Sequence, residues 1–373
     1  MRIKRLTAYG VELPQRVQYK MSVANYERLS TVVVEIHTDD GHVGVGQASV
    51  TAPAYSPYGE TLTSAVHAIN AVLGPRLIET DPLAIELAHL TMRKSLQGNP
   101  TAKTAIDIAL YDLSGKILGV PVFSLLGGPL TTKLPVLASI GYFPTGELVD
   151  RSVEAIEQGY GALKFRVGES LEVDVQNLTA IRKRIGEKFP ISIDFNQAMS
   201  LVHGRPDQAI SYIRRLEEFN LESVEQPVAG TDFENMASIT AAIDTPIVAD
   251  ESVWTLQDAK RAIEMRACDI IKIKIVKTGG LLFARKMAAL CEAAGMALVV
   301  GHGIAGVVQN AAEAHLAASL PNWKAPGEMN GYLKLAKDIG LPLRFESGAL
   351  ELNSAPGLGV TLSTREIKEL AVA

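Results

Sequence analysis

Cysteine is almost absent from this sequence, since Cys268 and Cys291 are the only two among 373 residues. Two cysteines cannot build a disulfide framework, and their scarcity suits a reducing cytosol. The first residues, Met1–Thr7, lack the apolar stretch of a signal peptide, and no run approaches the roughly 18 apolar residues of a membrane span. We therefore expect a soluble cytoplasmic protein without a membrane partner.

An excess of basic residues is also missing. The formal net charge is -5 and the pI is near 5.9, which argues against nucleic acid as a partner. No Walker loop, Ser-His-Asp order or zinc-site spacing occurs, and the pairs Gly127–Gly128 and Gly279–Gly280 are better interpreted as turns. These absences exclude several common enzyme classes.

Apolar residues are plentiful, and at 47% of the chain they can fill a large core in two structural units. Residues 3–13, 30–38 and 42–48 predict an antiparallel meander, with Asp40-Gly41 as a hairpin turn. Apolar residues at helical spacing follow over 61–73, 82–96 and 102–118. This order of elements predicts an α+β unit.

A long polar loop is expected between the first two strands, over residues 15–28. Loops of this length on a rigid scaffold are commonly functional. Ser22 and Tyr26 in this loop, and Tyr55 further along the chain, are therefore candidate substrate contacts.

From Leu134 onward, strand-like and helical segments alternate to about residue 330. The apolar strand-like runs are at 134–140, 161–166, 190–195, 221–225, 246–250, 270–275 and 296–301. Such alternation predicts an α/β fold with a TIM-like barrel, whose chemistry lies at the carboxyl ends of the strands. Two later strand-like pieces, 349–352 and 359–362, are expected to return to the first unit and close its sheet.

Three of the predicted strands end on an acidic residue, namely Asp194, Glu225 and Asp250. Because the crossover helices return the chain, the ends of parallel strands meet on one face, and these acids should lie side by side. One such acid is often only a helix N-cap. Three in consecutive units instead predict a site for a hard divalent cation, with Mg²⁺ first and Mn²⁺ second, and Asn196 beside it.

Basic residues are expected at the same face. Lys164 and Arg166 share one side of their strand, as do Lys272 and Lys274. Because a charge on an inward position of an apolar strand is costly, we assign Lys164, Arg166 and Lys274 to catalysis. Lys272, together with Lys277 and Lys103, is expected to be solvated or to support the site from behind.

Two further candidates follow the last strands of the barrel. His302 lies in a glycine-rich loop after the seventh apolar run, and Glu328 follows the eighth. Either residue is compatible with catalysis or with a supporting role.

Taken together, these motifs resemble the enolase superfamily, in the muconate cycloisomerase-like subgroup of the mandelate racemase/muconate lactonizing enzyme family. The resemblance extends over nearly the whole chain. The motifs that carry it are Lys164–Arg166, Asp194–Asn196, Glu225–Pro227, Ala249–Ser252, the run IKIKIVKTGG at 271–280, Tyr58–Thr61, Gly98–Lys103, Leu125–Gly128 and Ala355–Gly359.

This resemblance implies a modified (β/α)7β barrel over residues 126–335, capped by an α+β domain that residues 1–125 and 336–373 form together. It implies Mg²⁺ held by Asp194, Glu225 and Asp250, and transfer of a proton at the carbon next to a carboxylate. Lys274 would be the acid/base on one face and Lys164 with Arg166 on the other, while Glu328 matches a family acid. Family members are also often homo-oligomers that act on small carboxylates.

One position departs from the family pattern, which usually has lysine at both ends of Lys-x-Lys, whereas Arg166 is the second residue here. A guanidinium group is effectively never deprotonated, so Arg166 is a poor base. Either Lys164 takes that role, or the chemistry is one-sided through Lys274. His302 is another option, but Ile271 stands where the mandelate racemase branch has its aspartate.

The favoured hypothesis is therefore a Mg²⁺-dependent muconate-type cycloisomerase. A racemase or epimerase of an amino-acid derivative, a hydroxy-acid dehydratase, a Schiff-base aldolase and a metal-stabilised barrel without catalysis are the alternatives. If Lys274 is a base at neutral pH, its pKa must lie roughly 2–3 units below 10.4.

Overall fold

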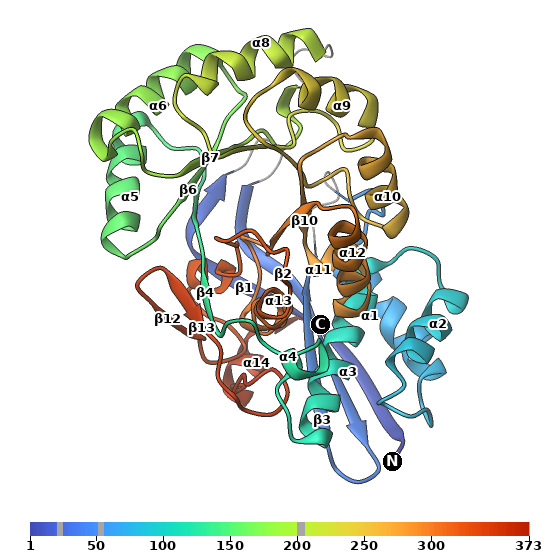
Figure 1. Ribbon diagram of the computed structural model, residues 1–373. Helices are drawn as coiled ribbons and strands as arrows, with labels where there is room; N and C mark the ends of the chain where they lie inside the picture. The colour runs from blue at the N-terminus through green and yellow to red at the C-terminus, as the bar shows by residue number, and fades with distance from the viewer. Residues whose placement is uncertain (21–24, 51–55, 200–205, 373) are drawn as a thin grey trace.

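An antiparallel sheet opens the chain and has the order β14-β1-β2-β3. The structure, a computed structural model, describes residues 1–20, 25–50, 56–199 and 206–372 (Figure 1). The strands are β1 (Ile3–Lys20), β2 (Asn25–Thr38), β3 (Val43–Ser49) and β14 (Ala371–Val372). Gly41, at φ +90° in the turn between β2 and β3, supplies the backbone conformation that the predicted hairpin needs. The predicted meander is thus confirmed.

The polar loop expected over residues 15–28 is wrong for most of its length. Strand β1 continues to Lys20 and β2 begins at Asn25, and Lys20 pairs with Asn25 across the ribbon. Ser22 lies outside the described residues.

Helices of the first unit pack on this sheet or on one another. They are α1 (Leu62–His67), η1 (Ala68–Leu73), η2 (Gly74–Arg76), α2 (Ile85–Ser95), α3 (Pro100–Leu118) and α4 (Val122–Leu125). Helix α3 is buried along most of its length because it lies directly against β3. A Cβ on Gly46 would lie only 1.9 Å from the carbonyl oxygen of Ala105, so only glycine permits this close approach.

The second unit is a curled parallel sheet with the order β11-β10-β9-β8-β7-β6-β5. Its strands are β5 (Ala138–Ile140), β6 (Leu163–Arg166), β7 (Ile191–Asp194), β8 (Ser223–Glu225), β9 (Ile247–Ala249), β10 (Ile270–Ile273) and β11 (Ala297–Val300). The connecting helices are α5 (Thr145–Glu157), α6 (Leu171–Ile185), α8 (Pro206–Glu217), α9 (Phe233–Ala242), α10 (Leu256–Met265), α11 (Ile275–Thr278), α12 (Leu281–Ala293) and α13 (Val307–Ala318).

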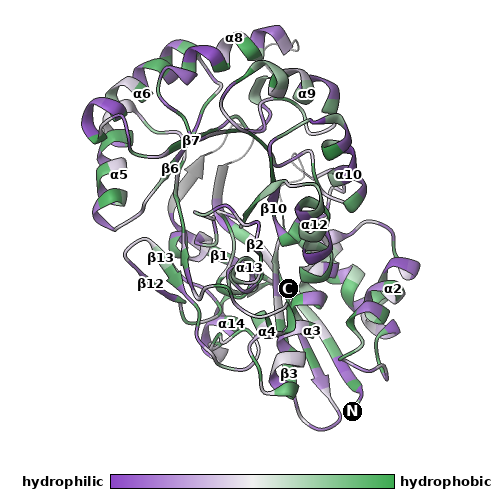
Figure 2. Ribbon diagram, viewed as in Figure 1, coloured by the Kyte–Doolittle hydropathy of each residue, from purple (hydrophilic) through white to green (hydrophobic). Residues whose placement is uncertain are grey.

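Most of these helices form an arc around the sheet (Figure 1). Hydrophobic residues concentrate on the strands, and hydrophilic ones lie along the outward faces of α5, α6 and α8 (Figure 2). This distribution is the one that a parallel sheet covered by amphipathic helices requires. The predicted α/β barrel class is confirmed.

The barrel closes through a segment that occupies the place of an eighth strand without a regular ladder. Trp323 forms a parallel bridge with Leu298 on one side, and Gly327 forms one with Val136 on the other. Glu328 directly follows this segment, and its backbone N–H donates to Val300 O at 3.0 Å. The closure therefore carries Glu328 to the carboxyl edge of the barrel.

The C-terminal segment behaves differently from the expectation. The first piece expected there forms β13 (Ala349–Glu351), but it pairs with β12 (Arg344–Glu346) and β4 (Lys133–Pro135) rather than with the first sheet. Residues 359–362 do not form a regular strand. It is β14, after α14 (Thr364–Leu370), that pairs with β1.

The first unit packs against the barrel at several points. The Thr104 hydroxyl donates to Ile275 O at 3.0 Å, and Asp107 accepts the N–H of Leu281 at the start of α12. Ser49, at the end of β3, contacts Gln309 on α13. In the described part of the chain, no helix is long and apolar enough to cross a membrane.

Candidate active site

A cavity lies at the carboxyl edge of the barrel, beneath the first unit. Leu29, Ser49 and Val50 of the first unit lie on one side of it. From the barrel it is lined by Arg166, Asn196, Asp250, Glu251, Trp254, Lys272, Lys274, Lys277, His302, Gly303, Ile304 and Glu328. The side chains predicted to carry the chemistry thus meet where a barrel places its active site.

The three strand-end acids converge as expected from the βα repeat. Asp194 and Glu225 are direct register partners on β7 and β8, and Asp250 follows β9. Gln226 fixes this loop, since its Oε1 accepts the N–H groups of Asp250 at 2.9 Å and Ser252 at 3.1 Å. Gln226 itself adopts φ +38°, a strained conformation of the kind that clusters at functional sites.

Lys164 lies beneath the carboxylates, with only 1% of the residue exposed. Its Nζ lies 2.9 Å from Glu225 Oε2 and 3.3 Å from Asp194 Oδ2, and it also contacts Glu328 Oε1. Burial opposes ionisation of Glu328, but Lys164 and Lys272 outweigh it and hold the pKa of that carboxyl well below its usual value. Lys164 is therefore engaged on three sides by acids.

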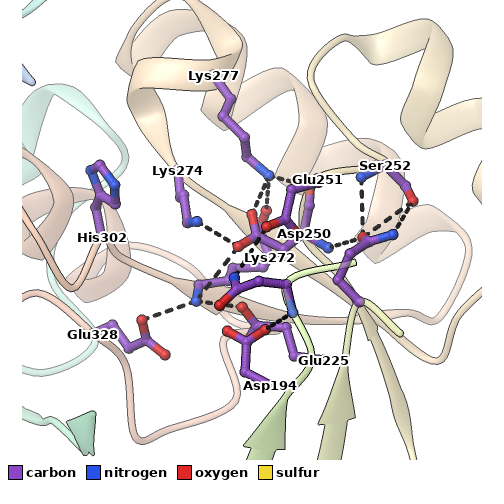
Figure 3. A network of polar contacts seen from close by, with 12 residues as sticks. Asp194, Glu225, Asp250, Glu251, Ser252, Lys272, Lys274, Lys277, His302 and Glu328 are labelled. Carbon is purple, nitrogen blue, oxygen red and sulfur yellow. Dashed lines mark hydrogen bonds and ion pairs between the residues drawn. The ribbon is translucent and has the colours of Figure 1, made fainter. Parts of the chain in front are cut away.

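Lys272 was expected to be solvated or to support the site, and the structure agrees with the second of these alternatives. It is 1% exposed, and its Nζ lies 2.9 Å from both Glu225 Oε1 and Glu328 Oε2 and 3.9 Å from Asp250 Oδ2. Although burial alone lowers its pKa, the surrounding carboxylates raise it well above the usual value. Lys272 is thus a permanent cation that bridges the acids (Figure 3).

Arg166 faces the cavity at the end of β6. Its Nη1 contacts Asp194 Oδ2 and donates to Asn196 Oδ1 at 2.7 Å. Burial disfavours the charged form of Asp194, but Arg166 and Lys164 outweigh burial and hold its pKa below the usual value. The pairing of Arg166 with Asn196 also places Asn196 in the site, as predicted.

Lys274 and Lys277 both reach Asp250. Lys274 Nζ lies 2.5 Å from Asp250 Oδ2 with 17% of its side chain exposed, whereas Lys277 Nζ donates to Asp250 Oδ1 at 2.8 Å and is buried. Lys277 was therefore not solvated. Burial alone lowers the pKa of Lys274, but Asp250 reverses that effect and raises it. The sequence predicted a lowered pKa for Lys274 as a base, and the contacts of Lys274 with other side chains give the opposite direction.

Glu251 belongs to the site although the sequence did not single it out. It is 8% exposed, lines the cavity, and accepts Asn196 Nδ2 at 3.2 Å. Burial, with the charge of Asp250, raises its pKa to about 7. Its position directly after Asp250 is the signal that could have identified it.

His302 lies beside Lys274 at the edge of the network (Figure 3). Burial and the charge of Lys274 hold its pKa well below the usual value, so the imidazole is neutral. Lys103, by contrast, lies apart from this network and donates to the carbonyl oxygens of Leu96 and Gly98.

The expected aromatic substrate contacts are not placed by the structure. Tyr55 lies outside the described residues. Tyr26 belongs to β2, but its side chain is not among those described.

The three strand-end acids offer oxygen ligands of the kind that a hard cation binds. Within the described residues, no three acidic, histidine or cysteine side chains form a ready-made ligand set, and Lys164 and Lys272 each contact two of the three strand-end carboxylates. Even so, all three strand-end acids present buried carboxylate oxygens at one edge of the barrel, where burial and the neighbouring Asp194 raise the pKa of Glu225 to about 8. Buried carboxylate oxygens are the ligands that Mg²⁺ prefers, so the residues fit the ion.

A barrel with acids and ammonium groups at its carboxyl edge, under an α+β cap, defines an enzyme that can stabilise an anion formed beside a carboxylate. The chain belongs to the mandelate racemase/muconate lactonizing enzyme family of the enolase superfamily. Residues 5–127 match the N-terminal domain of that family, and residues 147–367 match the enolase C-terminal domain-like family. Proton abstraction alpha to a carboxylate is the chemistry that this superfamily shares.

Relatives of known activity fall into two groups. N-succinyl-L-Arg/Lys racemase of Bacillus cereus is 32% identical over 372 residues, which cover 100% of this chain and 98% of the racemase, and its crystal structure matches with a TM-score of 0.95. Muconate lactonizing enzyme from Pseudomonas fluorescens, complexed with muconolactone, is 28% identical with a TM-score of 0.94, covering 100% of this chain and 99% of that one.

A third structure bears on the cofactor. Dipeptide epimerase from Enterococcus faecalis, complexed with Mg and the dipeptide L-Leu-L-Tyr, is 31% identical with a TM-score of 0.90, covering 97% of this chain and 100% of that one. Members of the family thus bind Mg²⁺. The family expectation is confirmed, whereas the relatives divide between racemases or epimerases and cycloisomerases.

Proposed function

We propose that this protein is a Mg²⁺-dependent cycloisomerase of a muconate-type dicarboxylate, in which Lys274 transfers the proton on one face only. Asp194, Glu225 and Asp250 would hold the cation. The observation that carries the proposal is that the two sides of the cavity present different cations. Lys274 follows β10 on one side, and Arg166 ends β6 on the other.

Arg166 cannot exchange a proton near neutral pH, because its guanidinium group stays charged. Lys164 could replace it only by leaving three carboxylates, and it is not among the described residues that line the cavity. Lys272 does line the cavity, but its ammonium group is held by Glu225 and Glu328. Lys274 therefore has the position for proton transfer, and Arg166 has the position for binding negative charge.

One proton-transfer group is sufficient for cycloisomerisation. One carboxylate oxygen of the substrate adds to the conjugated double bond, so that a C–O bond forms while the π pair moves towards the other carboxylate as an enediolate. The α-carbon then takes a proton from an N–H bond of Lys274. Because Asp250 raises the pKa of Lys274 above its ordinary value, the side chain is an ammonium group at neutral pH, the form needed for this step.

A divalent cation, when bound, would stabilise the negative charge that develops on the enediolate. Arg166 adds a fixed positive charge on the other side of the cavity, and Leu29 and Val50 of the first unit add apolar lining. Racemisation differs, because the proton must leave on one face and return on the opposite one.

A racemase or epimerase of an N-acyl amino acid is the second candidate. It is favoured by the similarity to the Bacillus cereus racemase over the whole chain. This function requires the ammonium group of Lys164 to reach the α-carbon from beneath Arg166.

Turnover in D2O with Mg²⁺ separates these candidates. Muconate and N-succinyl-L-lysine are incubated with the protein and followed by ¹H NMR. We expect a lactone with deuterium on a single face from muconate, and no α-deuterium in N-succinyl-L-lysine. Deuterium with loss of configuration in the succinyl compound would support the racemase, and no reaction of either compound would contradict both.

Two matched variants test the role of the proton donor. Lys274→Met should abolish lactone formation, since loss of a general acid lowers the rate by about 10²–10⁴-fold. Lys103→Met, which removes a lysine bonded to backbone carbonyls outside the site, should retain turnover.

A further inference from the structure

The imidazole of His302 is held from one side by an amide whose orientation is fixed. Gln309 Nε2 lies 3.3 Å from His302 Nδ1. On the other end of the same amide, Gln309 Oε1 accepts the backbone N–H of Ser49 at 2.7 Å and its hydroxyl at 2.9 Å. Because a backbone N–H can only donate, the oxygen must face Ser49 and the NH₂ group must face the histidine.

Both hydrogens of that NH₂ group have partners. One is directed to Glu313 Oε1 at 3.2 Å, and the other to His302 Nδ1. The other oxygen of Glu313, Oε2, receives the backbone N–H of His302 at 3.2 Å and Asn310 Nδ2 at 2.9 Å. Asn310 cannot be reversed either, because its Oδ1 accepts the backbone N–H of Tyr332 at 3.0 Å.

The other ring nitrogen of His302, Nε2, does not face the Gln309 amide. His302 lines the cavity, and among the described residues none hydrogen bonds to its Nε2. Since Nδ1 faces a donor, it has to accept, and the proton of a neutral imidazole must sit on Nε2. The ring therefore offers an N–H donor to the cavity.

We propose that Gln309 is a positioning residue that locks His302 in the neutral Nε2–H form, and that this N–H donates to an acceptor oxygen of the substrate. The proposal rests on the proposed function in one respect, because it describes the end of the carboxylate substrate that lies at His302. It also links the two units, since the amide is oriented by Ser49 of the first unit while His302 belongs to the barrel.

The Nε2–H tautomer of His302 determines which substrate groups can bind to the ring. A carboxylate or amide oxygen can accept the Nε2–H, whereas a substrate ammonium group would meet a donor. Lys274 and Lys272 disfavour a second proton on the ring, whereas Asp250 and Glu328 favour it. Glu313, which accepts the backbone N–H of His302, is a further titratable neighbour, and burial raises its pKa to about 8. His302 is consequently a donor to substrate and not the base of the reaction.

Histidine ring nitrogens can be observed directly by NMR in protein labelled with ¹⁵N-histidine. Of the seven histidines in the chain, the His302 signals are those lost in His302→Gln. Near neutral pH we expect a protonated Nε2 and a bare Nδ1. A proton on Nδ1 would overturn the proposal, and this wild-type spectrum decides it even if buried variants fail to fold.

Variants of Gln309 and Ser49 test the role of the amide separately. In Gln309→Glu a carboxylate faces the ring, so the proton should appear on Nδ1. Ser49→Ala removes a hydroxyl but keeps the orienting backbone N–H, and the wild-type pattern should persist. An unchanged spectrum in Gln309→Glu, or a changed one in Ser49→Ala, would contradict the role given to Gln309.

Kinetics with muconate test the donor itself. His302→Leu should raise KM about tenfold or more, as expected for one hydrogen bond to a charged acceptor, and His302→Gln, which keeps an N–H donor, should restore much of the loss. Equal KM values in the two variants would overturn donation to substrate. Absence of muconate turnover in the wild type would instead refute the proposed function and leave the ring form measurable by NMR.

Discussion

Replacing Lys272 by methionine tests whether this buried cation neutralises the site. The change leaves Glu225 and Glu328 without one ammonium group at 2.9 Å each. Removing one partner of a buried ion pair costs about 3–5 kcal/mol. Because Lys164 still contacts both carboxylates, we expect a loss near the lower end, about 3 kcal/mol.

Differential scanning calorimetry provides the measurement. An unfolding entropy of about 0.8 kcal/mol/K for 373 residues converts the loss into a Tm decrease of about 4 °C. The decrease should grow as the pH rises. Glu225 has a pKa raised above its ordinary value, and the stability linked to such a carboxyl is lost as pH rises through about 8.

The same calorimetric comparison can be made with added Mg²⁺. At about 100 times its Kd, a ligand of the folded state adds about 2.7 kcal/mol of stability. The variant should gain more than the wild type, because its carboxylates lack one positive charge. Lys103→Met is the matched control, because this buried lysine hydrogen bonds to the carbonyl oxygens of Leu96 and Gly98, and its Mg²⁺ response should equal that of the wild type. A Tm of Lys272→Met equal to that of the wild type would refute the reasoning.

Three other changes have defined outcomes. Arg166→Lys adds an ammonium group opposite Lys274, so N-succinyl-L-lysine should gain α-deuterium with loss of configuration, and chiral chromatography that shows no gain would argue against this placement. Burial raises the pKa of Asp174 to about 6, so as the pH rises from about 4 to 6 the wild type should lose about 3 kcal/mol more stability than Asp174→Asn. Urea unfolding measures this difference, and parallel curves for the two proteins would contradict it. Gly46→Ala forces β3 away from Ala105 and should cost about 1–3 kcal/mol, whereas Gly146→Ala, with open space around it, should not destabilise the protein.

The positions of the strand-end acids could be predicted because they depend on a regular repeat. Each parallel strand returns to the same edge, so the place of Asp194, Glu225 and Asp250 in the chain fixes their place in the fold. Outer helices of the barrel such as α5, α6, α8 and α10 could be predicted equally well, since each buries one face and exposes the other.

The length of the β1-β2 ribbon could not be predicted from a regular sequence pattern of this kind. Its distal part is rich in polar residues such as Gln15, Arg16 and Arg28, so the alternation that marks a half-buried strand is missing. Strand β13 shows a related limit, because strand-forming residues identify a strand but not its partner. One of its two partners, β4, lies more than two hundred residues earlier in the chain.

The burial of Lys272 could not be foreseen because its partners are distant in sequence. Glu225 and Glu328 are 47 and 56 residues away, and without them a buried ammonium group is strongly disfavoured. The same reason explains the pKa of Lys274, whose direction is set by the contact with Asp250.

Charge balance narrows the substrate class. Among the described residues, five carboxylates stand against five cations in and beneath the cavity, namely Asp194, Glu225, Asp250, Glu251 and Glu328 against Lys164, Arg166, Lys272, Lys274 and Lys277. A bound divalent cation favours the ionised forms of Glu225 and Glu251, whose pKa values are raised to about 8 and about 7 without it, and with all five carboxyls ionised it adds two positive charges to a neutral set. A dicarboxylate restores neutrality, whereas a monocarboxylate leaves a buried excess charge that is costly to maintain. Muconate should therefore inhibit or react at lower concentration than its monomethyl ester in the presence of Mg²⁺, and equal affinities in a competition assay would show that the second carboxylate lies outside the site.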